Sequence, residues 1–251
     1  MNDGSVSHVA ALFDIHGNLP ALEAVLDEFR RLSVDEVIVG GDVFPGPMPI
    51  AVLERLNRLE MPVRFIRGNG DRVVLAAKAG RDISEVPEPF QDVVRWCARH
   101  LDDEREGRIA AWPLTRVEGL GEVLFCHATP RSDTQIFTKL TAEKRLRPLF
   151  DPLDVSVVVC GHTHMPFDRR VGNTRVVNAG SVGMPFGAPG AYWALLGPGL
   201  ELRRTEYDLR QAADRVRATP YPRAEQFAAR NIIAPPSEEE MLQAFARAEL
   251  R

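Results

Sequence analysis

Three strand–turn–helix units follow one another at the start of the chain, and they constrain the fold more than any other feature. Each begins with a short apolar run typical of a buried strand, continues into a polar turn, and ends in a segment with helical apolar spacing. The expected strands cover 6–13, 36–39 and 63–66, and the expected helices cover 19–29, 49–59 and 73–79. Consecutive units of this kind predict parallel strands joined by right-handed crossovers.

Polar side chains follow each of these strands at the point where the strand ends. Asp14 and His16 follow the first strand, Asp42 the second and Asn69 the third. In a parallel sheet the functional groups collect beyond the carboxyl ends of the strands. We therefore expect these four side chains to lie at one edge of the sheet.

A second set of polar residues follows two strands further along the chain. The β-branched run 157–160 stops at Gly161 and is followed by His162 and His164, and the apolar run 123–126 is followed by His127. In an extended backbone residues two apart point to the same side, which predicts that His162 and His164 address one point beyond the strand end. Taken alone, this segment fits equally well a turn whose histidines hydrogen-bond to the backbone.

The remaining segments are less regular. We treat 80–118 as a helical insert, with prolines at 87 and 89, a helix at 93–101 and a charged run at 102–108 that indicates a solvated helix end or loop. This insert either overhangs the site or forms a connecting hairpin without ligand contact, and the sequence leaves both open. Two further strand pairs are expected, 167–171 with 174–178 and 192–196 with 200–205, so the second half is antiparallel or mixed. From about 207 to 251 we expect a helical extension of one domain that covers 1–251, with Ser237 and Glu240 as a capping box for its last helix.

Composition excludes several classes of protein. The chain has 251 residues, 45% of them hydrophobic, and a formal net charge of -4, which gives no general reason to expect nucleic-acid or membrane affinity. Cys97, Cys126 and Cys160 are an odd number without paired spacing, which indicates packing residues in a reducing compartment. Because no signal peptide or membrane span is apparent, we expect a cytoplasmic protein. Whether copies of the chain form a homo-oligomer is left open.

The donor set predicts a centre with two metal ions. The chain has six histidines, and four of them follow strand ends, whereas His8 and His100 do not. Seven nitrogen and oxygen ligands without a thiolate are too many for one tetrahedral ion, and two ions that share a carboxylate fit them better. The seven candidate ligands are Asp14, His16, Asp42, Asn69, His127, His162 and His164. Two divalent cations bring a charge of about +4 and the two carboxylates -2, so the site would attract anions in an acidic protein.

This charge balance favours phosphate chemistry. Between two ions about 3.5 Å apart a bridging water loses a proton near neutral pH, while the same ions bind phosphate oxygens. We expect hydrolytic phosphoryl transfer by direct in-line attack, without a covalent enzyme intermediate, on a small phosphate-ester substrate.

The same residues carry a family resemblance. The blocks Asp14-x-His16, Gly41-Asp42, Gly68-Asn69-x-Asp71, His127 and Gly161-His162-x-His164 resemble, in order, those of the calcineurin-like metallophosphoesterase superfamily. Finer details, including the segment 178–183, resemble its small prokaryotic phosphodiesterase-like branch. The resemblance implies an α/β fold, a four-layer αββα sandwich with two mixed sheets, and two divalent ions that are manganese, iron, nickel or zinc.

The resemblance also implies roles for the ligands. It places Asp14, His16 and His164 on one ion and Asn69, His127 and His162 on the other. Asp42 bridges the two ions and holds the nucleophilic hydroxide. The implied activity is hydrolysis of phosphodiesters, with phosphomonoesters as a further substrate class. Weaker candidates for substrate contact are Asn18, Asn178 and Ser181, for which a helix cap and a structural turn are the alternatives.

One departure from the family pattern concerns the leaving group. Many members carry a histidine after the metal-binding asparagine, whereas this chain has Gly70. We expect weak protonation of the leaving group and a preference for activated esters. Two alternatives remain: a protein phosphatase or dinucleoside-polyphosphate hydrolase, against which Gly70 counts, and a binding scaffold with this fold but no catalysis, against which the complete ligand set counts.

Overall fold

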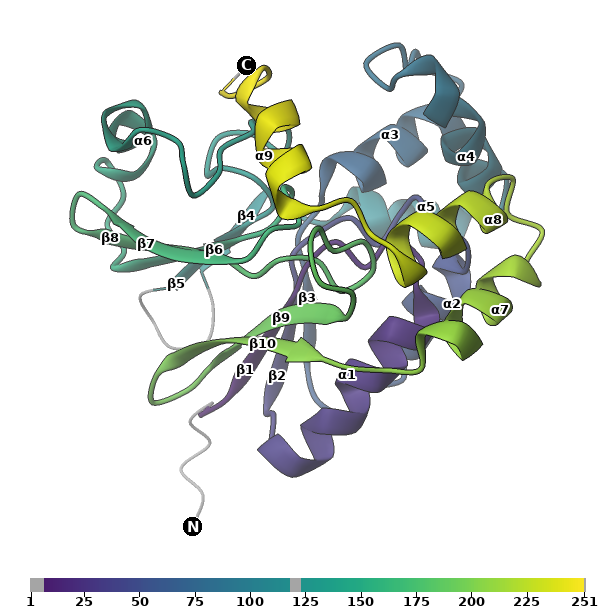
Figure 1. The fold of residues 1–251 in the computed structure, drawn as a ribbon, viewed down its shortest axis with the longest axis horizontal. Helices are drawn as coiled ribbons and strands as arrows, with labels where there is room; N and C mark the ends of the chain where they lie inside the picture. The colour runs from purple at the N-terminus through teal and green to yellow at the C-terminus, as the bar shows by residue number, and fades with distance from the viewer. Residues whose placement is uncertain (1–6, 118–122, 251) are drawn as a thin grey trace.

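Two five-stranded sheets form the centre of the computed structural model, which describes residues 7–117 and 123–250 (Figure 1). Val6 and Glu118, at the expected bounds of the first strand and of the insert, lie outside the described residues. The first sheet has the order β10 (Leu200–Thr205), β9 (Ala191–Leu196), β1 (Val9–Leu12), β2 (Glu36–Val39) and β3 (Val63–Phe65). The second has the order β4 (Thr115–Val117), β5 (Val123–Cys126), β6 (Val157–Cys160), β8 (Thr174–Asn178) and β7 (Phe167–Val171).

Both sheets are mixed, as expected. Strands β1, β2 and β3 are parallel, and their crossovers contain α1 (Leu19–Leu32) and α2 (Pro49–Asn57). Strands β5, β6 and β8 are also parallel, whereas β4, β7, β9 and β10 pair antiparallel with their neighbours. The sequence predicted the β9–β10 pair but not its partner, which is β1 of the first sheet.

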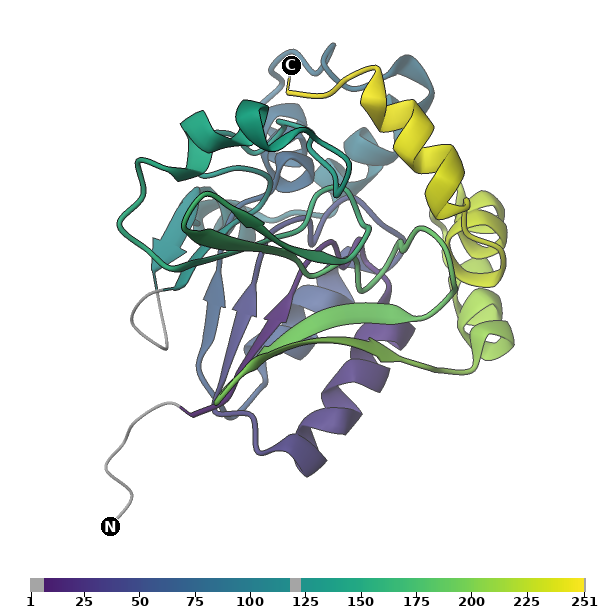
Figure 2. The same cartoon turned by 60° about the vertical axis from the view of Figure 1, so that its left-hand side comes forward.

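Alternation along the strands creates four layers. In β1, Ala10 and Leu12 pack against the helices outside the first sheet, whereas Val9 and Ala11 pack between the sheets. In β6, Val159 belongs to the layer between the sheets, and its neighbours pack toward α6 (Glu143–Phe150). Figure 2 shows the two sheets stacked, with α1 outside one and α6 outside the other. The four-layer αββα sandwich is therefore confirmed.

Three helix starts differ from expectation. Helix α3 (Asn69–Lys78) begins four residues early because Gly68 caps it and the Asp71 carboxylate accepts the Gly68 amide at 3.0 Å. Helix α4 (Glu88–Arg99) includes Pro89 in its first turn, where a proline is tolerated. The charged run after it is a separate helix, α5 (Asp103–Ala110), capped by Asp102. Thus the prolines at 87 and 89 start a helix rather than interrupt one.

The C-terminal part is helical and lies along one side of the sandwich (Figures 1 and 2). It contains α7 (Leu209–Arg217), α8 (Ala224–Phe227), the π-helix η1 (Ala228–Ile233) and α9 (Glu238–Ala246). The Ser237 hydroxyl accepts the Glu240 amide at 3.2 Å, and the Glu240 carboxylate accepts the Ser237 amide at 2.8 Å, which confirms the capping box. No helix among the described residues combines the length and apolar character needed to cross a membrane. Cys97, Cys126 and Cys160 are buried packing residues, as expected.

Candidate functional site

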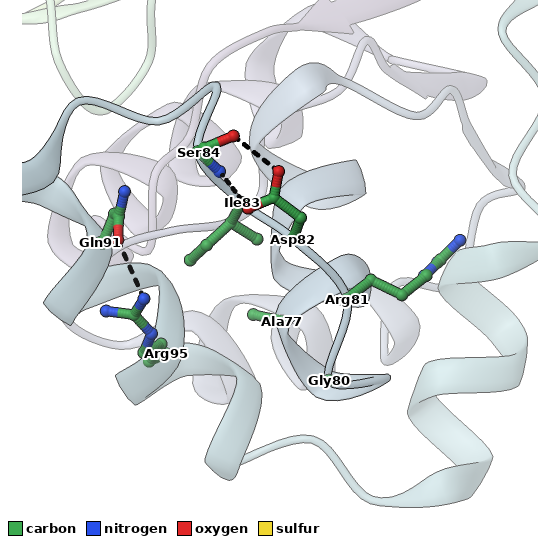
Figure 3. A pocket seen from close by; sticks show the side chains of 8 residues that line it. All are labelled: Ala77, Gly80, Arg81, Asp82, Ile83, Ser84, Gln91 and Arg95. Atoms are coloured by element: carbon green, nitrogen blue, oxygen red, sulfur yellow. Dashed lines mark hydrogen bonds between the residues drawn. The ribbon is translucent and has the colours of Figure 1, made fainter.

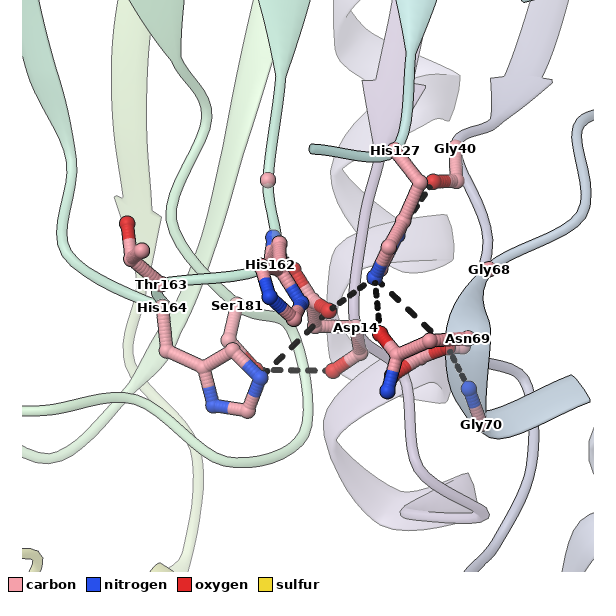
Figure 4. Close-up of polar contacts among 12 residues, drawn as sticks. Asp14, Gly40, Gly68, Asn69, Gly70, His127, His162, Thr163, His164 and Ser181 are labelled. Carbon is pink, nitrogen blue, oxygen red and sulfur yellow. Dashed lines mark hydrogen bonds and ion pairs between the residues drawn. The ribbon is translucent and has the colours of Figure 1, made fainter. Parts of the chain in front are cut away.

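The seven candidate ligands converge at one edge of the sandwich, beyond the carboxyl ends of strands from both sheets. Figure 4 shows Asp14, Asn69, His127, His162 and His164 among them. Asp42 lies between two imidazoles: its Oδ2 is 3.6 Å from His16 Nε2, and its Oδ1 is 3.6 Å from His127 Nε2. Asp14 Oδ1 is 3.4 Å from His164 Nε2 and 3.8 Å from His127 Nε2. Asp42 therefore faces one histidine from each of the two ligand sets that the family resemblance implies.

The remaining two ligands join the His127 side of the centre. Asn69 Oδ1 lies 3.0 Å from His127 Nε2, and the rings of His127 and His162 have centroids 5.1 Å apart. On the other side, the rings of His16 and His164 are also 5.1 Å apart. The four imidazoles thus form two pairs.

The donor atoms fit divalent metal ions. Two groups have ligand atoms that all lie within 4.8 Å of one another: Asp14 with His16 and His164, and Asp14 with Asp42 and His127. Asp14 Oδ1 is buried and has no hydrogen-bond partner among the described residues. An unpaired buried carboxylate oxygen costs free energy unless it is compensated. A cation between Asp14 and the imidazoles would supply that compensation.

Each imidazole is oriented by a backbone carbonyl. The contacts are His16 Nδ1 to Pro45 O at 3.1 Å, His127 Nδ1 to Gly40 O at 3.0 Å, His164 Nδ1 to Met184 O at 2.7 Å and His162 Nε2 to Thr134 O at 3.2 Å. Because a carbonyl only accepts, the nitrogen that faces it carries the proton. The other nitrogen is left as an acceptor, which is the arrangement of histidines that bind metals. No pattern in the sequence predicted these carbonyl partners.

The ligand loops have a strained backbone. Positive φ occurs among the described non-glycine residues at Asp14, His16, Asp42, His162, His164, Ser33 and Leu250. Five of these seven are candidate ligands, and residues held in this region of conformational space cluster at functional sites. The geometric argument that His162 and His164 address one point from an extended backbone is wrong, because their φ angles are 66° and 58°. They instead point to the two different pairs, which agrees with the ligand assignment that the resemblance implies.

Backbone contacts between loops fix the position of Asp14. Its amide donates to Gly41 O at 3.1 Å, and its Oδ2 accepts the His162 amide at 2.8 Å. Its carbonyl accepts the Ser181 hydroxyl at 2.7 Å and the Gly183 amide at 3.0 Å. Four loops from distant parts of the chain therefore meet at this one residue, through its amide, its carbonyl and its carboxylate.

The three candidate substrate contacts have structural bonds in the described structure. Asn18 caps α1 by accepting the Ala21 amide at 3.2 Å and donates to Gly183 O at 3.0 Å. Asn178 donates to Gly161 O at 2.6 Å, and Ser181 holds Asp14 as described above. All three are at most 1% exposed. Contact with a substrate stays a prediction that this geometry does not support; these residues position the ligand loops.

Asp71 is a site residue whose role the sequence did not reveal. Its carboxylate accepts the amides of Asp42 at 2.9 Å, Phe44 at 3.0 Å and Gly68 at 3.0 Å, so it ties the loops after β2 and β3 together. Burial and the nearby charge of Asp42 raise the pKa of Asp71 to about 7. The only signal was its place in the Gly68-Asn69-x-Asp71 block.

Burial also shifts the pKa values of the candidate ligands. It lowers the pKa of both His16 and His162 to about 3, with the charge of a neighbouring histidine adding to the effect. Burial and the charge of Asp14 raise the pKa of Asp42 well above its ordinary value. For Asp14 burial opposes ionisation, but His164 and His127 outweigh it and lower the pKa. His16 and His162 are therefore neutral near pH 7, as metal binding requires.

The insert overhangs the site. A cavity of about 220 Å³ is lined by site residues together with residues of the insert; the lining is His16, Asp42, Pro45, Asn69, Gly70, Val73, Glu85, Val86, Pro87, Val94 and Thr134. The first of the two interpretations of the insert is therefore confirmed. A separate cavity of about 420 Å³ between α3 and α4 shares none of these residues; in it Arg95 donates to Gln91 at 2.9 Å and the Ser84 hydroxyl donates to Asp82 at 2.6 Å (Figure 3).

Gly70 lies where a side chain has no room. A Cβ atom there would be 2.2 Å from Phe44 O and 2.9 Å from Asp42 Oδ1, while the Gly70 amide donates to Asp42 Oδ1 at 2.7 Å. A histidine therefore cannot replace Gly70 without movement of the loop that carries Asp42. The local packing therefore favours glycine at the position where many family members carry a histidine.

We predict that Gly70→Ala destabilises the protein by about 2 kcal/mol, because overpacking a closed site has a cost of this order. Urea unfolding monitored by circular dichroism measures the change. Gly107→Ala is the control: it lies inside α5 with nothing within 4 Å of an added Cβ, and we expect it to be neutral or stabilising. Equal effects of the two substitutions would contradict the packing argument.

We predict that His16 makes the metal-free protein less stable as the pH falls. The folded state keeps this imidazole neutral down to about pH 3, whereas the unfolded chain binds a proton below 6.5. The free energy of unfolding should therefore fall, relative to His16→Gln, by about 1.4 kcal/mol per pH unit in that window. Urea titrations of both proteins at pH 6.5, 5.5 and 4.5 test this, and parallel curves would refute it.

Comparisons with known proteins agree with the geometry. The family model of the calcineurin-like phosphoesterase superfamily domain matches residues 8–197. The uncharacterized protein MJ0912 of Methanocaldococcus jannaschii is 26% identical over 84% of this chain and 92% of its own length. Phosphodiesterase YfcE of Escherichia coli is 27% identical over 73% of this chain and 83% of its own.

Solved structures show the same fold. Protein PH1004 of Pyrococcus horikoshii superposes with a TM-score of 0.76 at 21% identity, and a metallophosphoesterase of Sphaerobacter thermophilus with a TM-score of 0.72 at 22% identity. Each covers 92% of this chain and 99% of its own. The matched region of the family model contains every candidate ligand and most of both sheets. The chain therefore belongs to the calcineurin-like phosphoesterase superfamily.

Proposed function

We propose that this protein is a metal-dependent phosphoesterase that hydrolyses phosphodiester bonds in small substrates, with phosphomonoesters as a further substrate class. The observation that carries the proposal is the buried, unpaired Asp14 Oδ1 surrounded by imidazoles whose outer nitrogens are held by carbonyls. Family membership and the relative named a phosphodiesterase support the same reaction class.

The ligands divide between two ions in this proposal. Asp14, His16 and His164 hold one, Asn69, His127 and His162 hold the other, and Asp42 is shared. Two divalent cations would supply a nucleophile from water near neutral pH and positive charge for the phosphate oxygens. Manganese, iron, nickel and zinc all accept ligand sets of imidazole nitrogens and carboxylate oxygens.

The chain itself positions the oxygen atoms of Asp42 and sets the charge of the candidate ligands. The Gly70 amide donates to Asp42 Oδ1 and so leaves Asp42 Oδ2 as the oxygen turned toward His16. Neutral His16 and His162 add no positive charge of their own to the two carboxylates of the site. An anionic phosphodiester would then meet a net positive centre. No side chain at Gly70 reaches the leaving group, so its protonation is weak.

We predict that Asp42→Asn abolishes hydrolysis of bis(p-nitrophenyl) phosphate and reduces bound metal from about two ions per chain. Asparagine offers one neutral oxygen where the carboxylate offers two charged ones. Elemental analysis of the gently purified protein and release of p-nitrophenolate are the measurements.

Asp27→Asn is the matched control, because the Asp27 side chain is 71% exposed and lies on α1. It should retain both metal and activity. A wild-type protein that neither binds metal nor hydrolyses any phosphate ester would overturn the proposed function and favour a binding scaffold.

We predict a steep dependence of rate on the leaving group, because Gly70 supplies no acid. Across a series of aryl phosphodiesters, kcat should fall by at least about tenfold between nitrophenyl and phenyl leaving groups. Rates independent of leaving-group pKa would show that another residue protonates the departing oxygen.

A further inference from the structure

One arginine joins three segments beside the site. Arg72 of α3 binds both carboxylate oxygens of Glu85, at 2.7 Å and 3.0 Å, and also binds Asp133 Oδ2 at 2.7 Å. Glu85 belongs to the insert, and Asp133 to the loop between β5 and α6. We name Arg72, Glu85 and Asp133 the rim triad. Two carboxylates and one guanidinium leave the rim triad with a net charge of -1.

The rim triad borders the cavity that contains the site residues. Glu85 lines that cavity directly, and Thr134, the neighbour of Asp133, lines it as well. Thr134 O also accepts the proton of His162 Nε2 at 3.2 Å. The rim triad is therefore connected both to the insert and to a candidate ligand.

Four apolar residues line the same cavity, and we call them the apolar wall: Val73, Val86, Pro87 and Val94. The candidate ligands His16, Asp42 and Asn69 line it as well. A phosphodiester whose phosphate lies at these three residues would place one ester group in the cavity, against the apolar wall and near Glu85.

The chemistry of these surfaces favours one kind of ester group. Transfer of an apolar group from water to a position against the valine and proline side chains is favourable. A group with its own negative charge would lie beside a rim of the same sign. The charge of Arg72 is already included in the net charge of -1, and its Nε and both Nη atoms bind the two carboxylates, so it leaves no spare positive charge for the ester group.

We propose that the substrate is a phosphodiester whose ester group in this cavity is uncharged and apolar, such as an aryl or short alkyl group, and that Glu85 determines this specificity by excluding anionic groups. The inference rests on the proposed phosphodiesterase function and names its substrate class. Esters that carry a second phosphate or a carboxylate are poor substrates.

A matched pair of substrates tests this inference. Both carry a p-nitrophenyl ester, and the other ester group is phenyl in one and 4-carboxyphenyl in the other. We expect the wild-type protein, loaded with manganese, to prefer the phenyl compound in kcat/KM by about fivefold or more, the order of effect of a partly exposed charge. Glu85→Gln should bring the ratio close to one, chiefly by lowering KM for the carboxylated compound.

Glu88→Gln is the control, because Glu88 is an exposed residue at the start of α4 in the same insert and does not line the cavity. It should leave the wild-type ratio unchanged. A binding measurement gives a second readout: calorimetric Kd values of diphenylphosphinate and its monocarboxylated analogue, which cannot be hydrolysed, should show the same preference and the same loss of it in Glu85→Gln.

The outcomes separate the two proposals. Equal kcat/KM for both substrates in the wild-type protein, or an unchanged preference in Glu85→Gln, would overturn the role of Glu85 while the phosphodiesterase function stands. Hydrolysis of neither substrate by metal-loaded protein would instead overturn the proposed function. A preference that persists undiminished at high salt in the wild-type protein would likewise overturn the role of Glu85 and assign the preference to the apolar wall alone.

Discussion

Two carboxylates buried side by side among imidazoles are the constraint on which the rest of this structure depends. Asp14 is 0% exposed and Asp42 4% exposed, and the charge of Asp14 adds to burial in raising the pKa of Asp42. Burial of unpaired like charges is strongly unfavourable unless a cation or a proton compensates it. The cluster is held in place by Asp71, by the Gly70 amide and by the four carbonyls that bind the histidines. Each of these groups fixes a candidate ligand without adding a positive charge.

The backbone around the cluster follows from the same constraint. Ligands drawn from both sheets must approach one region, so the loops after β1, β2 and β6 turn sharply through left-handed conformations. Glycines permit the close contacts between them: a Cβ at Gly68 would lie 2.1 Å from Asp42 Oδ1, and one at Gly161 would lie 2.4 Å from Asp14 Oδ2. The left-handed conformations lower the stability of these loops, but they bring the metal-binding donor atoms together.

Sequence reasoning predicted much of the fold because the determining signals are local. Apolar runs and turn residues identified the parallel strands β1 to β3 and the hairpin β7–β8, and strand ends identified all seven residues that converge. The pairing of β9 with β1 is a contact between residues far apart in sequence, and no local pattern reports it. The early starts of α3 and α4 were missed because a capping carboxylate and prolines in a first turn resemble loop signals.

The site was predictable in its residues and not in its geometry. The order of Asp, Asn and His at strand ends indicated the donors, but left-handed φ angles at His162 and His164 arise from packing between loops. The rim triad could not be predicted from the sequence either, because Arg72, Glu85 and Asp133 belong to no motif and meet only in the folded chain.

The attachment of Asp14 to the segment around Ser181 has a consequence for biosynthesis. Asp14 is synthesised long before Ser181 and Gly183, whose hydroxyl and amide hold its carbonyl. Contacts with such long sequence separation form late in folding. The Asp14 carbonyl therefore gains these partners only after the segment around Ser181 has been made, and the carboxylate cluster reaches its final arrangement late in folding.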